Sequence, residues 1–428
     1  MELSIVVPYF RQRRCLELTL RSLAGQRPDA DGFDVVVVDD DSRDDVDQLV
    51  AAYRDRLDVR LVRQPVNRGR AAARNRGAEE ATGERILLLD ADSMADPDLV
   101  AGHARFHRTR PNDVLLGVRV EHDWRAVAGS TATAGPPTVA AYHTDLRYRW
   151  GLDPATFSDG PAPWTFAYSH NMSVPADHFH QIGGFDERFV KWGHEDIEFA
   201  YRLFVASARR PGYFHFDPTA RCHHLPHFRH NATNWAEANQ MLPYLVGKHR
   251  TLEVELYEEG PMGVNAALPV YLTRLQTLYG VANQVGLGET LDALRQPLPP
   301  GRLGIGIGLA DRMPPADGSD VLEHRPESGA APALIGIRLP FPDHRFADLL
   351  NFDVWRIASP EHLSKMVVDG LRVARTMYLG ASREVPGGAD VGLIDCPDYL
   401  CDMLSGYAEA DVVHDGDHAW VVRVRRRT

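Results

Sequence analysis

The sequence predicts an α/β protein in which an open parallel sheet is followed by a smaller α/β unit. Between residues 3 and 89, short β-branched or leucine-rich runs alternate with segments whose apolar residues have helical spacing. This alternation is typical of a parallel sheet with helices on both faces. Beyond about residue 250 the sequence changes character, and a stretch rich in proline and glycine, about 296–334, precedes a second set of predicted elements.

The predicted elements of the first unit follow one another closely. Residues 3–8 are expected to form a buried strand, and leucines at helical spacing predict a helix over 15–25 that stops at Gly25. The continuous β-branched run 33–38 predicts the second strand. The remaining predicted elements are a helix over 44–56, a strand over 59–62, a helix over 69–82, and strands over 85–89 and 114–120.

The later regions are assigned by composition and pattern. Residues 121–163 are rich in glycine, proline and threonine, and we expect a loop there that covers the substrate. The predicted elements of the second unit are a strand over 333–339, a helix over 361–379, and strands over 391–394 and 419–424. The predicted domains cover residues 1–250 and 300–428, with a helical connector over 251–299 between them, and the second domain is interpreted as an accessory unit.

The composition is that of a globular protein and excludes some classes of function. The 428 residues are 44% hydrophobic and 25% charged, and the net charge of −12 predicts no broad attraction to nucleic acid. The four cysteines have no metal-binding spacing, and the chain starts without a leader-like segment, so we expect a cytoplasmic protein. No run of about 18 apolar residues occurs, so no membrane span is expected.

Candidate ligand-binding residues lie at the ends of three of the predicted strands. These residues are Pro8 and Tyr9, Asp39 and Asp40, and Asp90 with Asp92. In open α/β sheets the ligand lies beyond the carboxyl ends of the strands, so the sequence predicts a site at this edge. Side chains at positions i and i+2 of an extended segment point the same way, so Asp90 and Asp92 are expected to face one hard divalent cation such as Mg²⁺ or Mn²⁺.

Six segments occur in an order that resembles family 2 glycosyltransferases of the GT-A fold. They are Ser4–Tyr9, Val37–Ser42, Asn67–Gly69 with Ala73–Gly77, Leu89–Asp92, Gly183–Glu187 and Trp192–Asp196. The last of these, Trp-Gly-His-Glu-Asp, is similar to a segment of galactosyl- and N-acetylgalactosaminyltransferases. The resemblance covers about residues 1–250 and implies a catalytic domain there, with donor binding over about 1–120 and acceptor binding and catalysis over about 165–250. One departure is Asp41, where the family has glycine; the turn there needs a positive φ, which aspartate tolerates better than most residues.

The resemblance implies a hexosyltransferase that uses a nucleotide-diphosphate sugar, with UDP favoured over other nucleotides. Asp90 and Asp92, with Ala91 between them, would hold the cation and the diphosphate, and the family favours Asp92 for the closer metal contact. Asp39 and Asp40 would face the uracil and the ribose. The other implied donor contacts are Pro8 and Tyr9 beside the base, Arg68 and Arg74 near the phosphates, and Trp192 on a sugar ring. Arg70 is interpreted as a solvated helix residue.

Glu195 and Asp196 are predicted to open a helix whose apolar stripe begins at Ile197. The helix dipole favours ionised carboxylates in the first turn, which suits a general base near neutral pH. The resemblance implies that Asp196 deprotonates the acceptor and that Glu195 hydrogen-bonds it.

A histidine cluster downstream would complete the metal site. His224 fits the family position best, with His223 and His227 behind it. The pair His170-Asn171 is a further candidate for the donor sugar pocket.

Several alternatives stay open. A single displacement with Asp196 as base predicts inversion at the anomeric carbon, but related Trp-Gly segments occur in retaining N-acetylgalactosaminyltransferases. A nucleotide-sugar-binding protein without turnover is a rival from another class. A nucleotidylyltransferase is disfavoured because residues 8–14 lack a glycine-rich loop. The acceptor is open between a glycan, a small metabolite and a peptide, and the accessory domain is open between acceptor binding, dimerisation into a homodimer and bracing.

Overall fold

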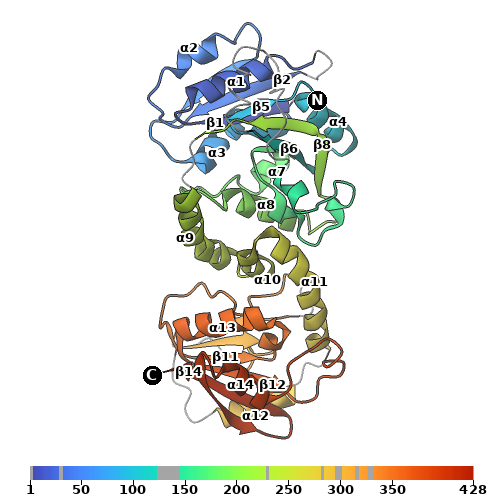
Figure 1. Ribbon diagram of the computed structural model, residues 1–428, viewed down its shortest axis with the longest axis vertical. Coiled ribbons are helices and arrows are strands. Elements are labelled where there is room, and N and C mark those ends of the chain that lie inside the picture. The colour runs from blue at the N-terminus through green and yellow to red at the C-terminus, as the bar shows by residue number, and fades with distance from the viewer. Residues whose placement is uncertain are drawn as a thin grey trace. The chain divides into compact units, whose positions relative to one another are not determined.

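The computed structural model (Figure 1) divides into two compact units, Met1–Met241 and Leu242–Thr428, and we describe each by itself. The structure describes residues 3–27, 32–122, 145–227, 231–280, 284–294, 301–313, 318–325 and 331–427. Most of the predicted covering loop over 121–163 lies outside these residues, as do parts of the predicted linker over 296–334.

Four parallel strands form one half of the N-terminal sheet, as the sequence predicts. β1 (Leu3–Tyr9) pairs with β2 (Phe33–Asp39) on one side and with β4 (Arg85–Leu89) on the other, and β3 (Val59–Arg63) extends the sheet beyond β2. β1, β2 and β4 are buried along nearly their whole length, while β3 at the edge is only partly buried, and all four strands run in the same direction. Their carboxyl ends therefore meet at one edge of the sheet.

The other half of the sheet is mixed, which the sequence does not predict. β7 (Asn171–Pro175) runs antiparallel between β4 and β6 (Val114–Glu121), and β8 (Phe214–His224) runs parallel to β6. The short β5 (Ser93–Ala95) pairs antiparallel with the end of β8. β8 contains a proline and several charged residues, so it has no clear strand pattern. Its end nevertheless brings a histidine-rich segment beside the tip of β4.

Helices pack on this sheet through small and apolar residues. Among them, α3 (Arg70–Glu80) lies against β1 and β2 through alanines and Gly77. A Cβ on Gly77 would lie 2.3 Å from Val6 Cγ1, so only glycine fits there. The other helices of the unit, apart from 3-10 turns, are α1 (Arg13–Leu23), α2 (Val46–Ala51), α4 (Leu99–Thr109), α6 (Leu146–Arg149), α7 (Ala176–Gln181) and α8 (Glu195–Ala206).

The C-terminal unit is a second α/β sheet, in agreement with the sequence. Its strand order is β10-β9-β11-β12-β14-β13, with β10 to β12 parallel and the last two strands antiparallel. The strands are β9 (Arg302–Gly306), β10 (Asp320–Glu323), β11 (Phe346–Phe352), β12 (Ala374–Ser382), β13 (Ala408–Asp415) and β14 (Ala419–Arg426). The helices are α10 (Leu252–Glu255), α11 (Gly260–Tyr279), α12 (Gln284–Ala293), α13 (Pro360–Val373) and α14 (Pro397–Leu404), while α9 (Asn231–His249) begins in the first unit and ends in the second.

Three sequence predictions for this unit are wrong. The predicted helix over 361–379 ends at Val373, and the chain continues directly as β12. No strand forms over the described residues 391–394. Residues 333–339 form only an isolated bridge at Ala333, because the backbone N–H groups of this segment donate to a side chain instead of to a neighbouring strand.

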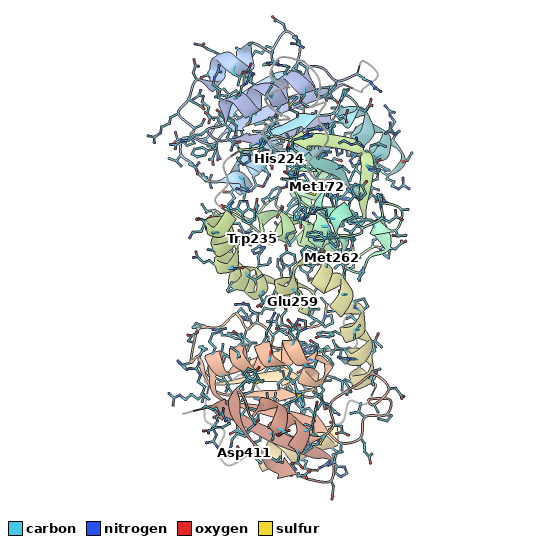
Figure 2. The ribbon with its side chains drawn as sticks, viewed as in Figure 1. Met172, His224, Trp235, Glu259, Met262 and Asp411 are labelled. Carbon is cyan, nitrogen blue, oxygen red and sulfur yellow. The ribbon has the colours of Figure 1, made fainter. Side chains whose placement is uncertain are left out.

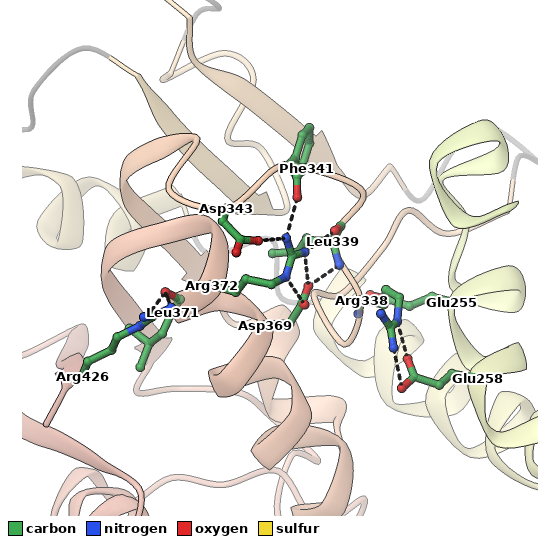
Figure 3. Close-up of polar contacts among 10 residues, drawn as sticks. All are labelled: Glu255, Glu258, Arg338, Leu339, Phe341, Asp343, Asp369, Leu371, Arg372 and Arg426. Carbon is green, nitrogen blue, oxygen red and sulfur yellow. Dashed lines mark hydrogen bonds and ion pairs between the residues drawn. The ribbon is translucent and has the colours of Figure 1, made fainter. Parts of the chain in front are cut away.

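That side chain is the buried carboxylate of Glu255, which accepts from the N–H groups of Ile335, Gly336 and Arg338 at 2.7–3.0 Å. Figure 3 shows how the following residues are held. Arg338 pairs with Glu258, and Arg372 donates to the carbonyls of Leu339 and Phe341 and to Asp369 and Asp343. The segment is irregular because side chains satisfy its backbone.

Among the described residues, no helix combines the length and the apolar character needed to cross a membrane.

Candidate active site

The tip of β4 is a tight turn that leads straight into β5. The N–H of Ser93 donates to the carbonyl of Asp90 at 3.1 Å, and Thr19 Oγ1 donates to the carbonyl of Ala91 at 2.8 Å. The carbonyl of Asp92 accepts from the N–H of Leu225 at 2.8 Å. The extended geometry expected for these residues is therefore wrong, because the chain reverses here. As a result, Asp90 and Asp92 have different partners.

Asp92 faces two histidines. Its Oδ2 lies 3.5 Å from His224 Nε2 and 3.2 Å from His227 Nδ1, and one ligand atom from each of the three residues lies within 4.8 Å of the others. His224 reaches this position because β8 pairs with β5 and places it opposite Ser93. Two ligand atoms at right angles, each about 2.1 Å from one octahedral ion, are about 3 Å apart. The spacing and the mixed carboxylate–imidazole donor set therefore fit a divalent cation such as Mn²⁺.

A carboxylate behind His224 sets its orientation. Glu121, at the end of β6, lies with Oε2 2.7 Å from His224 Nδ1, and Arg119 pairs with the other oxygen of Glu121 at 2.6 Å. Histidines that bind metals usually donate their second ring N–H to such a group, which fixes the tautomer and leaves Nε2 as the ligand atom. Burial lowers the pKa of His224, but Asp92 and Glu121 outweigh it and raise the pKa above its usual value.

His223 points to the other face of β8, as strand alternation requires. Its Nδ1 lies 2.8 Å from His122 Nε2, and its Nε2 lies 3.7 Å from Asp96 Oδ2. The structure therefore places His224 and His227, rather than His223, beside Asp92.

One buried arginine connects the tip of β4 to the start of α8. Arg74, which is 3% exposed, donates from Nη2 to Asp90 at 3.0 Å and from Nη1 to Glu195 at 3.2 Å. Its guanidinium also lies over the ring of Phe185 at 5.4 Å. Burial would lower the pKa of Arg74, but the charges of Asp90, Glu195 and Asp196 hold it above its usual value. Arg74 is therefore a charged fork that fixes two carboxylates at once.

The two acidic residues at the start of α8 differ in environment. Glu195 is buried against Arg74, and the exposed side chain of Arg70 lies 3.6 Å from the same carboxylate. Asp196 is half-buried and accepts from the N–H of Ile197 at 2.9 Å. Burial and the charge of Glu195 raise the pKa of Asp196 to about 7, although Arg74 opposes the shift. The sequence predicts that the helix dipole favours the ionised form of this carboxylate, whereas burial and the neighbouring charge favour the protonated form.

Asp39 and Asp40, at the end of β2, are engaged by the protein. Asp39 accepts from the N–H and hydroxyl of Ser42, with Arg63 at 3.5 Å. Asp40 accepts from Gln64 and from the N–H groups of Arg68 and Gly69, each at 2.8 Å. Asp40 therefore shapes the loop that leads into α3. Asp41 adopts φ 58°, the positive φ that its place in the turn was expected to need.

The other predicted donor residues occupy varied positions. The Tyr9 hydroxyl donates to Asp44, while the Arg68 side chain pairs with Glu187 at 2.5 Å. Pro8 is the position in β1 that pairs with Val38.

The pair His170-Asn171 does not form a common donor surface. Both polar atoms of the Asn171 side-chain amide are used inside the sheet: Oδ1 lies 2.9 Å from His103 Nε2, and Nδ2 donates to the carbonyls of Val118 and Ala220. The interpretation of Asn171 as a lining residue of the sugar pocket is therefore wrong. His170 is also buried, and burial with nearby arginines keeps its pKa well below the usual value.

Sequence reasoning misses Glu121 and Arg119. Both lie at the end of a predicted strand, but no sequence pattern connects them with a histidine that lies 103 positions away from Glu121. Only the pairing of β6 with β8 brings them together.

Comparisons with known proteins identify what the N-terminal unit is similar to. Residues 4–162 match the family model described as glycosyl transferase family 2, and residues 160–231 match one described as the N-terminal domain of galactosyltransferase. Residues 4–162 thus carry a family 2 glycosyltransferase segment. The open mixed sheet has the GT-A fold, as the sequence predicts.

Two curated relatives resemble the glycosyltransferase domain. The validoxylamine A glucosyltransferase of Streptomyces hygroscopicus subsp. jinggangensis is 34% identical over 214 residues, which cover 47% of this chain and 51% of that protein. The chondroitin synthase of Pasteurella multocida is 30% identical over 223 residues, which cover 47% of this chain and 23% of that protein. The chain thus spans about half of the first relative and less of the second.

A solved structure of S. aureus TarS, residues 1–349 with UDP-GlcNAc, aligns at a TM-score of 0.45 and 17% identity, over 68% of this chain and 78% of that one.

Proposed function

We propose that this protein transfers a sugar from a nucleotide-diphosphate sugar, with UDP as the favoured nucleotide, to a hydroxyl or other nucleophile of an acceptor. The observation that carries the proposal is the fork of Arg74, which joins the β4 tip and the start of α8 into one site. Asp90, at one end of this fork, is followed two positions later by Asp92 with its two histidines, and Glu195, at the other end, is followed directly by Asp196. A donor side and a base side are what a glycosyl transfer requires.

Asp92, His224 and His227 are proposed to hold a divalent cation, Mn²⁺ or Mg²⁺. The short distances between their ligand atoms and the support of His224 by Glu121 favour this role. Bound there, the cation would neutralise the negative charge that develops on the leaving diphosphate. Asp90 is proposed to act through Arg74, which keeps a positive charge beside the same edge of the sheet.

Asp196 is proposed to be the general base. Its carboxylate takes the proton of the acceptor nucleophile, the nucleophile forms a bond to the anomeric carbon, and the bond to the diphosphate breaks with its electron pair. A carboxyl group with a pKa of about 7 is well matched to this task at neutral pH. Attack opposite the leaving group inverts the anomeric configuration. Glu195, held by Arg74, is proposed to hydrogen-bond the acceptor.

The first experiment is a screen of nucleotide sugars for hydrolysis with Mn²⁺, with Mg²⁺ and with EDTA. We expect a UDP-sugar to be hydrolysed slowly in the presence of Mn²⁺ and the rate to fall to background with EDTA. Binding of UDP-sugars with no turnover under any condition would instead support a binding protein without catalysis.

The second experiment follows the anomeric proton of the product by NMR once an acceptor is found. Inversion is expected from a single displacement with Asp196 as base. Retention would contradict this mechanism and favour the retaining N-acetylgalactosaminyltransferase-like alternative.

A further inference from the structure

Trp235 on α9 is unusually exposed for a tryptophan. It exposes 62% of its surface, whereas Trp164, Trp355 and Trp420 are fully buried. Its ring meets that of Trp192 at a centroid distance of 5.6 Å and an interplanar angle of 76°. Figure 2 shows Trp235 on α9 of the ribbon. The two indoles form a right-angled corner, which we call the tryptophan corner.

The corner is fixed by contacts between α9 and the loop that precedes α8. The N–H of Trp192 lies 3.3 Å from Glu237 Oε2, and Lys191 Nζ donates to Gln240 at 2.9 Å. Gly193 has φ 101°, and a Cβ there would lie 2.8 Å from the Cβ of Ala238. This close approach fixes the loop next to Trp192, which precedes Asp196, the proposed base, by four positions in the sequence.

The same loop also touches the donor side. A Cβ on Gly69 would lie 3.0 Å from the carbonyl oxygen of Val190, and the N–H of Gly69 donates to Asp40. Arg68 pairs with Glu187 at the beginning of the loop. Residues 187–193 thus run from the loop shaped by Asp40 to the tryptophan corner and then into α8.

We propose that the tryptophan corner binds a carbohydrate ring of the acceptor, and that Trp235 determines how well that ring binds. This inference rests on the proposed transferase function and names its acceptor as a saccharide or a cyclitol. Such rings offer an apolar C–H face, which stacks on an indole, and hydroxyls at the edge, which donate to carboxylates. The corner supplies the indoles, and Glu237, which lies 3.3 Å from the N–H of Trp192, supplies a carboxylate beside it. Trp192 then belongs to the acceptor side rather than to the donor contacts that the sequence suggests.

The experiment measures binding of methyl glycosides of common hexoses and N-acetylhexosamines by saturation-transfer NMR, with UDP and the diamagnetic cation Mg²⁺ present. At least one methyl glycoside is expected to bind the wild-type protein, and Trp235→Ala is expected to weaken its Kd about tenfold, the range of a lost aromatic contact. Trp235→Phe, which keeps a ring, should recover most of the affinity. Tyr399→Ala, which removes an exposed aromatic side chain from α14, serves as the matched control and should leave Kd unchanged.

The outcomes separate this inference from the proposed function. Wild-type hydrolysis of a UDP-sugar combined with an unchanged glycoside Kd in Trp235→Ala, or with no glycoside binding at all, would overturn the acceptor-ring role alone. Absence of both UDP binding and hydrolysis would overturn the proposed function itself. If sedimentation shows a wild-type dimer that Trp235→Ala dissociates, a second copy of the chain occupies the corner, and the inference is also overturned.

Discussion

Both units place carboxylates at the ends of parallel strands, but Asp92 in the N-terminal unit has partners that differ from those of Asp353 and Glu323 in the C-terminal unit. In the C-terminal unit, Asp353 after β11 accepts from the N–H and hydroxyl of Ser382 and from Arg356. Glu323 at the end of β10 accepts from the N–H groups of Gly308 and Ala310. All of these partners donate hydrogen bonds to the carboxylates, so the side-chain oxygens of Asp353 and Glu323 are satisfied within the unit.

In the N-terminal unit, Asp92 faces imidazoles instead. An imidazole nitrogen with a lone pair can bind a metal, whereas a backbone N–H or a guanidinium cannot. The comparison teaches that an acidic residue at a strand end indicates a site only when the groups opposite it can also act as ligands.

The largest effect is expected from Asp92→Asn. Loss of the charged ligand should lower the transfer rate about 1000-fold, because the charge on the leaving diphosphate would no longer be neutralised. Initial rates at saturating Mn²⁺ measure this effect. Glu323→Gln is the matched control in the other unit, and its rate should stay within about twofold of the wild type. Equal losses of transfer rate in both variants would contradict the comparison, because Glu323, which has no imidazole partner among the described residues, would then matter as much as Asp92.

Asp353→Ala should affect stability rather than activity. It leaves Arg356, which is 2% exposed, without its buried carboxylate partner, so the free energy of unfolding of the C-terminal unit should fall by about 3 kcal/mol. Urea denaturation followed by tryptophan fluorescence measures the change. Asp417→Ala, at an exposed position, should shift the transition by less than about 0.5 kcal/mol. A stable Asp353→Ala protein with lost Mn²⁺ binding would instead indicate a second metal site.

Glu121→Gln should weaken Mn²⁺ binding about tenfold to 100-fold, the range found when the orienting partner of a metal-binding histidine is lost. Titration followed by Mn²⁺ electron paramagnetic resonance gives the affinity without any turnover. Glu84→Gln, an exposed carboxylate before β4, is the control. An unchanged affinity in Glu121→Gln would mean that His224 is not a ligand.

The smallest effect concerns pH. With a raised pKa of about 7, Asp196 carries a proton below neutral pH and cannot act as a base, so kcat/KM should fall up to tenfold per unit as the pH drops below about 7. Above pH 7 the carboxylate is ionised, and this dependence should disappear. Pre-steady-state rates over pH 5.5–8.5 test it with an acceptor whose own groups do not titrate there. A limb centred near pH 4 would show that burial does not control Asp196.

Much of the fold could be predicted from the sequence because its first four strands are continuous apolar runs. β1 to β4 and the helices between them lie where the pattern places them, although α2 is shorter than expected. The mixed half of the sheet could not be predicted, since β8 is interrupted by a proline and β5 has three residues. The turn at Asp90–Asp92 leads into β5, which pairs with β8 in the mixed half of the sheet. The geometry of this turn therefore could not be predicted from the sequence either.

The candidate site divides in the same way. Asp92 and the histidine cluster could be recognised from the sequence, because carboxylates and imidazoles are common metal ligands. The structure places Asp92 beside His224 and His227. The partners that position these residues, Glu121 and Arg119, come from a distant strand and have no local signature. The pKa of Asp196 could not be predicted either, because it depends on the depth of burial beside Glu195 and not on the helix terminus.

The guanidinium of Arg74 has a consequence for protein engineering. One planar guanidinium donates hydrogen bonds to both Asp90 and Glu195. A lysine in its place would pair with one of these carboxylates and leave the other without its partner. Libraries that aim to change the preference for the acceptor sugar should therefore keep position 74 fixed and diversify Trp235 and its neighbours. Variation there leaves the contacts of Arg74 with Asp90 and Glu195 unchanged.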